Sequence, residues 1–250
     1  MNDGMDIFFE VHRNLPREAP GGDIFTRQAF ESLPPLDDHL AILDIGCGAG
    51  AQTLVLAQLS NGDITAIDTH APFLDCLRQR ARDAGVGDRI HPQCISMMAL
   101  PFPDATFDLI WSEGAIYIIG VEAGLQQWRR YLKPGGYLVF SELVWLHPNP
   151  PAPVRDFWQS AYPAMQTVGE VGDRCQAQGY CLLDQFVLPA AAWENYYQPM
   201  EGRIQDLRQV YAQQPDALTV LEQEQQEIDI YRQFSDWYSY AFFVLQLSLS

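Results

Sequence analysis

Lysine is almost absent from this sequence, and acidic residues far outnumber basic ones. Lys133 is the only lysine, and 32 acidic against 15 basic residues give a formal net charge of −17. Such a surface repels nucleic acids and anionic membranes. The chain also has no apolar run near the ~20 residues of a membrane span, and its first residues lack the regions of a signal peptide. We therefore expect no nucleic-acid partner and no membrane insertion.

The cysteine content excludes two further classes of protein. The five cysteines are an odd number without a paired framework, which is typical of a reducing compartment, so we expect a cytoplasmic location. No cluster of cysteine and histidine has the spacing of a zinc site, so no metal is expected. The chain of 250 residues with 48% apolar residues suits one α/β domain with a sizeable core.

The most informative stretch runs from Ile42 to Gly50 and reads ILDIGCGAG. It is an apolar run that contains a carboxylate, followed by three glycines at alternate positions and then by a helical pattern from residue 51 to 59. This order predicts a buried parallel strand, a tight glycine turn and a helix. The N–H groups of the first helical turn then face a ligand that approaches the glycine backbone.

The glycine pattern fits two kinds of cofactor. Residues 46–51 satisfy the dinucleotide fingerprint, and residues 44–50 also resemble motif I of class I S-adenosylmethionine (SAM) methyltransferases. Asp44 favours SAM, because its carboxylate would repel the phosphates of NAD, whereas SAM has no phosphate and carries a sulfonium and an ammonium. The simpler alternative is a buried aspartate that holds the turn. The residues that we predict to contact SAM here are Asp44, Gly46, Cys47, Gly48 and Gly50.

A second acidic position follows the next strand. Asp68 lies 18 residues after Gly50, close to the spacing of an acid that binds ribose hydroxyls, and Thr69 follows it. A carboxylate accepts two O–H bonds from a ribose, which no neutral side chain matches. The alternative is that Asp68 and Thr69 cap the helix expected over residues 72–84. The two roles are compatible.

Strand and helix patterns alternate through the first part of the chain. Strands are expected at residues 41–45, 64–67, 89–95, 107–111 and 137–143, with helices at 51–60, 72–84 and 121–132 and a turn at 133–136. This alternation predicts a doubly wound parallel sheet with right-handed crossovers. Further helices are expected at 6–15, 23–33, 154–165, 168–178, 190–211 and 215–234, and further strands at 180–188 and 238–247.

Four motifs in the right order resemble the class I SAM-dependent methyltransferase family over roughly residues 38–145. They are the glycine turn, Asp68, the LPFPDATFD segment at 100–108 and the LKPGG segment at 132–136. The third is similar to a segment of the ubiquinone and menaquinone biosynthesis branch. Residues 111–117 with 17–22 also resemble a little-characterised bacterial branch with small-molecule or unknown substrates.

This resemblance implies a fold and a division of the chain. The implied fold is α/β: a mostly parallel, Rossmann-like, seven-stranded sheet of order 3-2-1-4-5-7-6, with strand 7 antiparallel and helical lid elements. The chain would be one domain, 1–250, with an N-terminal helical lid at 1–37, a cofactor half at 38–145 and a substrate or cap half at 146–250. The N-terminal helices can instead simply pack against the sheet edge, and the loop at 17–22 is either part of the lid or a plain turn.

The resemblance also implies an adenine contact, at which this sequence departs from the pattern. The family often has an aspartate after the third strand that accepts from the adenine amino group, and here that position is Ser96, followed by Met97. A serine hydroxyl can still accept, and the N–H of Met97 can reach a ring nitrogen. The cofactor would be SAM, which yields S-adenosylhomocysteine, with no metal.

Methyl transfer from a sulfonium needs alignment and exclusion of water, and a base only where the nucleophile must lose a proton. Glu113 and Glu142 follow or end strands at the expected site edge and are candidate catalytic bases, although Glu113 can equally touch SAM, and either acid can be structural. Tyr117, Trp145 and His147 can line the pocket of a small-molecule acceptor; alternatively, Tyr117 and Trp145 are core residues and His147 is a loop residue. Aromatic residues 193, 196 and 197 can form a cap or simple packing, and the Gln- and Glu-rich stretch 221–227 is expected to be a solvated helix face.

Three rival functions remain for comparison. A DNA methyltransferase is disfavoured, because the NPPA segment at 149–152 follows the fifth strand instead of the fourth and its Ala152 cannot stack on a flipped base. An NAD-dependent oxidoreductase is disfavoured by Asp44 and by the later motifs. A catalytically inactive SAM-binding protein would have the same binding residues, so the sequence leaves it open.

Overall fold

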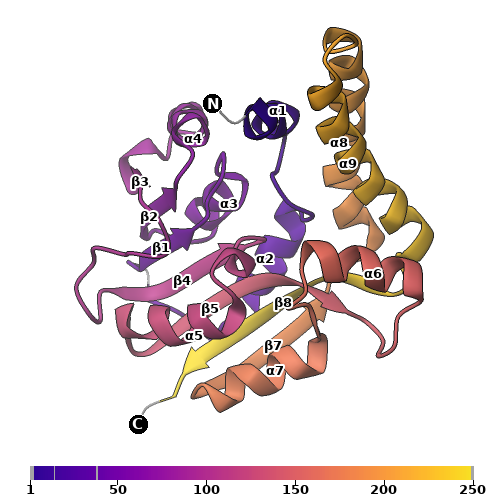
Figure 1. The fold of residues 1–250 in the computed structure, drawn as a ribbon. Coiled ribbons are helices and arrows are strands. Elements are labelled where there is room, and N and C mark those ends of the chain that lie inside the picture. Colours follow the sequence, from indigo (N-terminus) through magenta and orange to yellow (C-terminus); the bar gives the residue numbers. More distant parts are fainter. Residues whose placement is uncertain (1–2, 14, 38, 249–250) are drawn as a thin grey trace.

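A single mixed β-sheet runs through the protein, with helices on both faces, in the computed structural model (Figure 1). The structure describes residues 3–13, 15–37 and 39–248. Within these residues the sheet has eight strands in the order β3-β2-β1-β4-β5-β8-β7, and the short β6 pairs with β5. The strands are Ala41–Ile45 (β1), Asp63–Asp68 (β2), Ile90–Cys94 (β3), Phe107–Glu113 (β4), Leu132–Trp145 (β5), Gln166–Thr167 (β6), Tyr180–Val187 (β7) and Tyr238–Leu247 (β8).

The predicted topology is confirmed, with β6 as an unforeseen addition. Strands β1 to β5 are parallel where they pair, and β8 lies antiparallel to both β5 and β7. If the two-residue β6 is set aside, β7 and β8 are the expected sixth and seventh strands. The carboxyl ends of the parallel strands therefore meet at one edge, where ligands bind in open α/β sheets.

One expected turn lies inside a strand. Residues 133–136 were predicted to precede the fifth strand, but β5 begins at Leu132. Leu132 pairs with Phe107, and the register then shifts so that Tyr137 pairs with Leu109. The extra residues of β5 are accommodated as an irregularity of the ladder, with Gly135 at a φ of +75°. The sequence predicted that residues 133–136 turn, but it did not predict that they lie within a paired strand.

Helices cover both faces of the sheet because both faces are apolar. Ile42 of β1 packs in a core with Leu56 and Leu77 of the helices on one face, whereas the next residue, Leu43, packs with Leu125 and Trp128 on the other. This alternation is the two-residue period of a strand buried on both sides. The helices are Asp3–His12 (α1), Asp23–Glu31 (α2), Ala51–Leu59 (α3), Ala71–Asp83 (α4), Val121–Trp128 (α5), Ala152–Ala161 (α6), Val168–Ala177 (α7), Ala190–Val210 (α8) and Pro215–Phe234 (α9).

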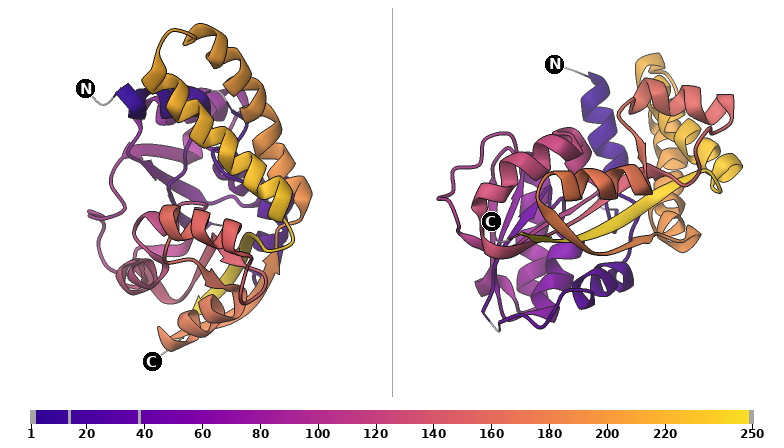
Figure 2. Two further views of the ribbon diagram at one scale, coloured as in Figure 1. Left: turned by 45° about the vertical axis from the view of Figure 1, so that its right-hand side comes forward. Right: turned by 90° about the horizontal axis from the view of Figure 1, so that it is seen from below.

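A third core lies beyond the carboxyl ends of the strands. There α1 packs against α8 and α9, which lie side by side as a long pair (Figure 2). This core is rich in aromatic rings, and Trp193 of α8 stacks on Tyr231 of α9 with ring centroids 4.1 Å apart. Helix α1 therefore meets α8 and α9 beyond the edge of the sheet at which the glycine turn lies.

Three composition-based expectations can be compared with the fold. All five cysteines lie in the described ranges and are free thiols. Among the helices that the structure describes, none is both long enough and apolar enough to cross a lipid bilayer. No group of three or more metal-ligating side chains occurs in the described part of the chain.

Candidate active site

The turn after β1 brings its backbone close to the carboxylate of Glu18. Gly48 has a φ of +53°, and a Cβ at this position would lie 2.4 Å from Glu18 Oε2. A side chain here would strain the backbone and clash with that carboxylate. The N–H groups of Gly46 and Cys47 both donate to the carbonyl of Ile67, at 2.9 and 3.0 Å, which ties the turn to the end of β2. The result is a cradle at the carboxyl ends of β1 and β2.

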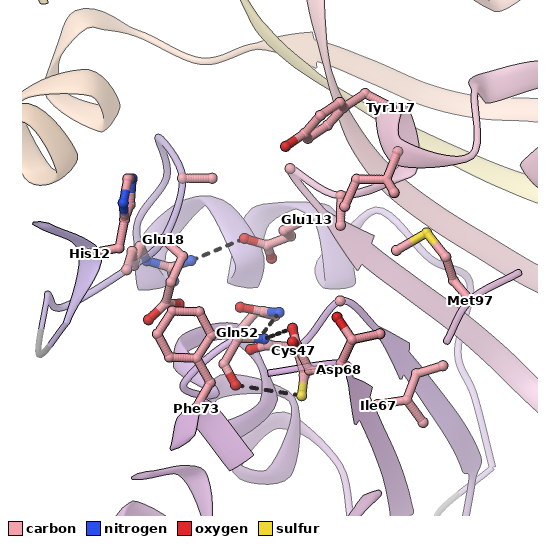
Figure 3. Close-up of a pocket in the computed structure, with 18 of the residues that line it drawn as sticks. His12, Glu18, Cys47, Gln52, Ile67, Asp68, Phe73, Met97, Glu113 and Tyr117 are labelled. Carbon is pink, nitrogen blue, oxygen red and sulfur yellow. Dashed lines mark hydrogen bonds and ion pairs between the residues drawn. The ribbon is translucent and has the colours of Figure 1, made fainter. Parts of the chain in front are cut away.

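A cavity of about 230 Å³ lies against this cradle (Figure 3). Its walls come from the carboxyl ends of β1, β2 and β4, from the loop after β3 and from the N-terminal segment, including Arg17 and Pro20. The predicted site residues that line it are Gly46, Cys47, Gly48, Asp68, Thr69, Ser96, Met97, Glu113 and Tyr117. Residues from four separate segments of the sequence are therefore brought to one cavity.

Asp68 bridges the turn and the start of α4. Its Oδ2 accepts from the N–H of Gly48 at 3.0 Å, and its Oδ1 accepts from the N–H of His70 at 2.8 Å. Each carboxylate oxygen keeps acceptor capacity for one more donor. Asp68 thus binds the backbone just before α4 and faces the cavity as well, a position compatible with both of its predicted roles.

The structure does not bring Asp44 and Gly50 to the cavity. Asp44 is fully buried, its Oδ2 accepts from Thr53 Oγ1 at 2.6 Å, and its Oδ1 accepts from Gln52 Nε2 at 3.3 Å. Burial raises the pKa of Asp44 to about 7, against the opposing effect of these hydrogen bonds. Gln52 does line the cavity, so Asp44 acts on it by orienting that amide. Gly50 faces Leu77 of α4 instead.

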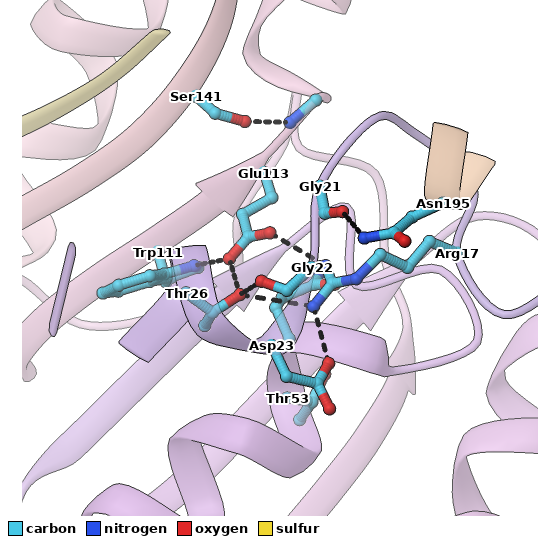
Figure 4. Close-up of polar contacts among 12 residues, drawn as sticks. Arg17, Gly21, Gly22, Asp23, Thr26, Thr53, Trp111, Glu113, Ser141 and Asn195 are labelled. Atoms are coloured by element: carbon cyan, nitrogen blue, oxygen red, sulfur yellow. Dashed lines mark hydrogen bonds and ion pairs between the residues drawn. The ribbon is translucent and has the colours of Figure 1, made fainter. Parts of the chain in front are cut away.

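Glu113 is held by three donors at the end of β4 (Figure 4). Its Oε2 accepts from Arg17 Nη1 at 3.0 Å, and its Oε1 accepts from Thr26 Oγ1 at 2.8 Å and from Trp111 Nε1 at 2.9 Å. Arg17 also donates to Asp23 Oδ1 at 3.0 Å. The side chains of Arg17 and Glu113 are 8% and 7% exposed. This buried pair fixes the segment between α1 and α2 against the sheet edge.

Glu18 is a site residue that the sequence analysis did not single out. Its Oε1 has no hydrogen-bond partner among the described residues. Burial, opposed by the amide of Ala49 and the charge of Arg80, raises the pKa of Glu18 to about 7. The sequence shows only an acid in a loop rich in proline and glycine, which predicts a lid or a turn and gives no sign that this side chain reaches the cavity.

A second cavity, of about 240 Å³, adjoins the first. The two share residues of α1, of the N-terminal segment and of the turn after β4, among them His12, Glu18 and Tyr117. Its remaining walls come from β5, α6, α8, α9 and β8. Six of the residues that line it are Trp or Tyr: Tyr117, Trp158, Tyr162, Trp193, Tyr196 and Tyr240. Residues 193 and 196, considered as cap or packing, are therefore cavity walls.

The expectation that residues 221–227 form a solvated helix face is wrong for three of them, Leu221, Glu224 and Glu227. Glu224 and Glu227 line the second cavity. Leu221 and Ile228 of α9 are fully buried, and Glu224 lies three residues after the first and four before the second, so it belongs to the same helix face. The spacing of Glu224 from Leu221 and Ile228 was the sequence signal for this helix face. The surrounding run of Gln and Glu obscured it.

Three further predicted site residues line neither cavity. Glu142 is 2% exposed; its Oε1 accepts from the N–H of Leu143 at 2.8 Å, and its Oε2 has no partner in the described part of the chain. Burial raises the pKa of Glu142 to about 8. The ring of Trp145 packs edge-on against Tyr238, and that of His147 packs against Trp237. Strand β5 and the loop after it place these two rings away from both cavities.

Sequence comparison finds related domains over part of the chain. Residues 42–136 match the methyltransferase domain family. An O-methyltransferase of Penicillium expansum is 29% identical over 166 residues, which are 65% of this chain and 59% of that protein. A dimethylglycine N-methyltransferase of Parasynechococcus marenigrum is 36% identical over 142 residues, 56% of this chain and 50% of that protein. The chain thus spans between half and three fifths of the length of these two curated relatives.

Structural comparison extends the likeness to nearly the whole chain. A SAM-dependent methyltransferase from Geobacter sulfurreducens, solved in complex with S-adenosylhomocysteine, superposes with a TM-score of 0.83. The match covers 96% of this chain and 97% of that one at 20% sequence identity. At this identity the likeness shows the fold, including the helices outside the matched domain.

Proposed function

Because residues 42–136 belong to the methyltransferase domain family and the whole chain has the fold of SAM-dependent methyltransferases, we propose that this protein transfers a methyl group from SAM to a small-molecule acceptor. The observation that carries the proposal is the pair of adjoining cavities at the carboxyl edge of the sheet. The first has the features of a cofactor site and the second those of an acceptor site.

The first cavity suits SAM better than NAD. Acids outnumber permanent cations at the cradle: Glu18, Asp68 and Glu113 line the cavity together with Arg17, and Asp44 lies behind it. Negative charge at this place favours a sulfonium and an ammonium and disfavours a pyrophosphate. Gly48 lines this cavity without a side chain, so its backbone is accessible to a bound ligand. We assign Asp68 to the ribose hydroxyls, and Ser96 and Met97, which line the same cavity, to the adenine.

The arrangement of the two cavities suits an in-line displacement. When bound, SAM supplies an electrophilic methyl group: a lone pair of the acceptor forms the new bond to carbon while the C–S bond breaks and its electrons stay on sulfur. Glu18, Ala19 and Tyr117 belong to both cavities and so surround the path between them. These residues hold the partners in line and exclude water, which is most of what such a reaction requires.

If the nucleophile carries a proton, that proton must leave. The geometry favours Glu18 as the group that takes the proton. It lines both cavities, and its pKa is raised to about 7, near the range in which a carboxylate works as a base at neutral pH. Glu113 remains a candidate, but three donors already hold its carboxylate, and only Oε2 keeps acceptor capacity for one more. Glu142 lies outside both cavities.

The division of the chain into functional parts also belongs to this proposal. Residues 1–37 supply the covering segment, residues 38–145 the cofactor site and residues 146–250 half of the residues that line the acceptor cavity. An inactive SAM-binding protein is the remaining alternative, because it would need the first cavity alone.

Binding of S-adenosylhomocysteine and of NAD, each measured by thermal shift and calorimetry, tests the cofactor. A ligand that binds only the native state raises the melting temperature by mass action. We expect stabilisation by S-adenosylhomocysteine alone, and we expect Gly48→Ala to abolish it. Gly85→Ala is the matched control, since Gly85 also has a positive φ, +70°, but no atom near its missing Cβ. Stabilisation by NAD alone would refute the proposal.

A further inference from the structure

The second cavity is lined by acids without a compensating cation. Its lining includes the carboxyl groups of Glu18, Glu224 and Glu227 and the imidazole of His12, and neither lysine nor arginine contributes to it among the described residues. His12 is 4% exposed, and burial lowers its pKa, so the imidazole is neutral at pH 7. The cavity therefore holds several acids and no permanent positive charge.

The two acids of α9 lie one helical turn apart on the face that lines the cavity. The side chain of Glu224 is 14% exposed, and its nearest basic atom is His12 Nε2, at 3.9 Å from Oε2. That same nitrogen lies 2.9 Å from the hydroxyl of Tyr196. Glu227 Oε1 accepts from the hydroxyl of Tyr197 at 2.9 Å. Within the described residues, neither the carboxylate of Glu224 nor Oε2 of Glu227 accepts a hydrogen bond from a cationic side chain.

A carboxylate withdrawn from water is costly unless a cation or several donors compensate for it. Burial, followed by the charge of Glu227, raises the pKa of Glu224 to about 8, which is the response of an acid that has no cation beside it. A positively charged ligand would remove this cost. It would also benefit from the rings on the other walls, because the faces of Trp and Tyr attract cations.

We propose that the acceptor carries a positively charged amino group, which binds between Glu224 and Glu227 of α9 and the aromatic walls formed by Trp158, Trp193 and Tyr196. This inference rests on the proposed methyl transfer only in naming the ligand an acceptor. The cation site itself follows from the cavity, its charge and its rings. A ligand with a carboxylate or a phosphate in this position would be repelled.

Three probes of similar shape and different charge test the cation site: 2-phenylethylamine, 2-phenylethanol and 3-phenylpropanoate. Calorimetry at pH 7.5 measures their binding to the full-length protein, both alone and with saturating S-adenosylhomocysteine. We expect the amine to bind at least tenfold more tightly than the alcohol, and the propanoate to bind least. Equal affinities, preference for the alcohol or the propanoate, or no binding of the amine would overturn the proposal.

The variants Glu224→Gln and Glu227→Gln remove the charges and keep the shape of the side chains. Each is expected to reduce the affinity for the amine about tenfold and to leave that for S-adenosylhomocysteine unchanged. Glu222→Gln is the control, because Glu222 is an exposed glutamate of the same helix, whose carboxylate pairs with Arg208 outside both cavities. It should leave both affinities at their wild-type values.

Two outcomes separate the cation site from the methyl-transfer proposal. If the amine binds the ligand-free protein and S-adenosylhomocysteine does not bind at all, the methyl-transfer proposal fails and the cation site stands. If the Glu224 and Glu227 variants keep the affinity for the amine, or lose no more of it than Glu222→Gln does, the cation site fails.

Discussion

At the scale of single residues, acids with similar sequence contexts have different duties in this protein. Asp44 and Asp68 each lie at or near the end of a strand, yet Asp44 is fully buried against Thr53 and Gln52, whereas Asp68 faces the cavity. The difference comes from position along the strand. Asp68 is the last residue of β2, but Asp44 is followed by one more residue of β1 and so points into the layer of helices.

Replacing Asp68 tests the ribose contact. Asp68→Ala is expected to weaken the binding of S-adenosylhomocysteine roughly tenfold to hundredfold, because charge-assisted hydrogen bonds are worth about 1.5–3 kcal/mol. Titration calorimetry gives the affinity, and a melting curve without ligand confirms that the variant folds.

Asp88→Ala, at an exposed aspartate, provides the comparison. An Asp68→Ala protein that melts normally and binds with the affinity of the wild type would place the ribose elsewhere.

At the scale of elements, the glycine turn fixes how α3 and α4 pack. Gly50 has a φ of +88°, and a Cβ there would lie 2.2 Å from Leu77 Cδ1 and 3.0 Å from its Cγ. The residue that immediately precedes α3 and the buried face of α4 therefore touch at a point where no side chain fits. Gly50 serves helix packing, whereas Gly48 serves the cavity.

The substitution Gly50→Ala is expected to destabilise the fold by about 2–4 kcal/mol, since it combines backbone strain with overpacking. Urea unfolding measures the change. Gly85→Ala, at a φ of +70° with open space around the added Cβ, should cost about 1–2 kcal/mol from strain alone. Equal losses in the two variants would mean that Leu77 moves aside freely.

The sequence predicted elements and order well where local patterns coincide with tertiary pairing. The strands over 41–45 and 238–247 have the expected bounds, and the glycine turn and Asp68 lie where the motifs suggested. The walls of the second cavity could not be predicted in the same way. Glu18 and Glu224 lie more than two hundred residues apart, and only the packing of α1 against α9 brings both to one cavity.

At the scale of the whole molecule, buried acids make stability depend on pH. Burial raises the pKa of Asp44 and Glu18 to about 7 and that of Glu142 and Glu224 to about 8. In the unfolded chain these groups ionise near their ordinary values of 3.8 and 4.5. The native state therefore binds more protons, so its stability falls as pH rises from the unfolded to the folded pKa.

We expect the free energy of unfolding to decrease between pH 6.5 and pH 8.5. Each fully buried carboxyl contributes up to about 1.4 kcal/mol per pH unit while it titrates. His12, whose pKa is lowered from 6.5, makes the free energy of unfolding increase with pH, but mainly below its ordinary value of 6.5. Urea unfolding at several pH values gives the curve.

The slope has an internal control in Glu142→Gln, which removes one of the titrating groups from outside both cavities. Its decrease over the same interval should be smaller than that of the wild type by roughly 1–2 kcal/mol. Stability that rises with pH in the wild type, or an unchanged slope in the variant, would contradict this account of the buried acids.

The separate origins of the two cavities bear on how such proteins diversify. Among the residues of the acceptor cavity named above, only Tyr117 falls within the matched stretch 42–136, and the others come from α1, the segment after it and the C-terminal half. Under the proposed function, mutations in α6, α8 and α9 can therefore reshape the acceptor walls and leave the cofactor cavity unchanged. Proteins with this fold can then acquire new acceptors through mutations in the C-terminal half. Sequence similarity between them would decrease first in that half.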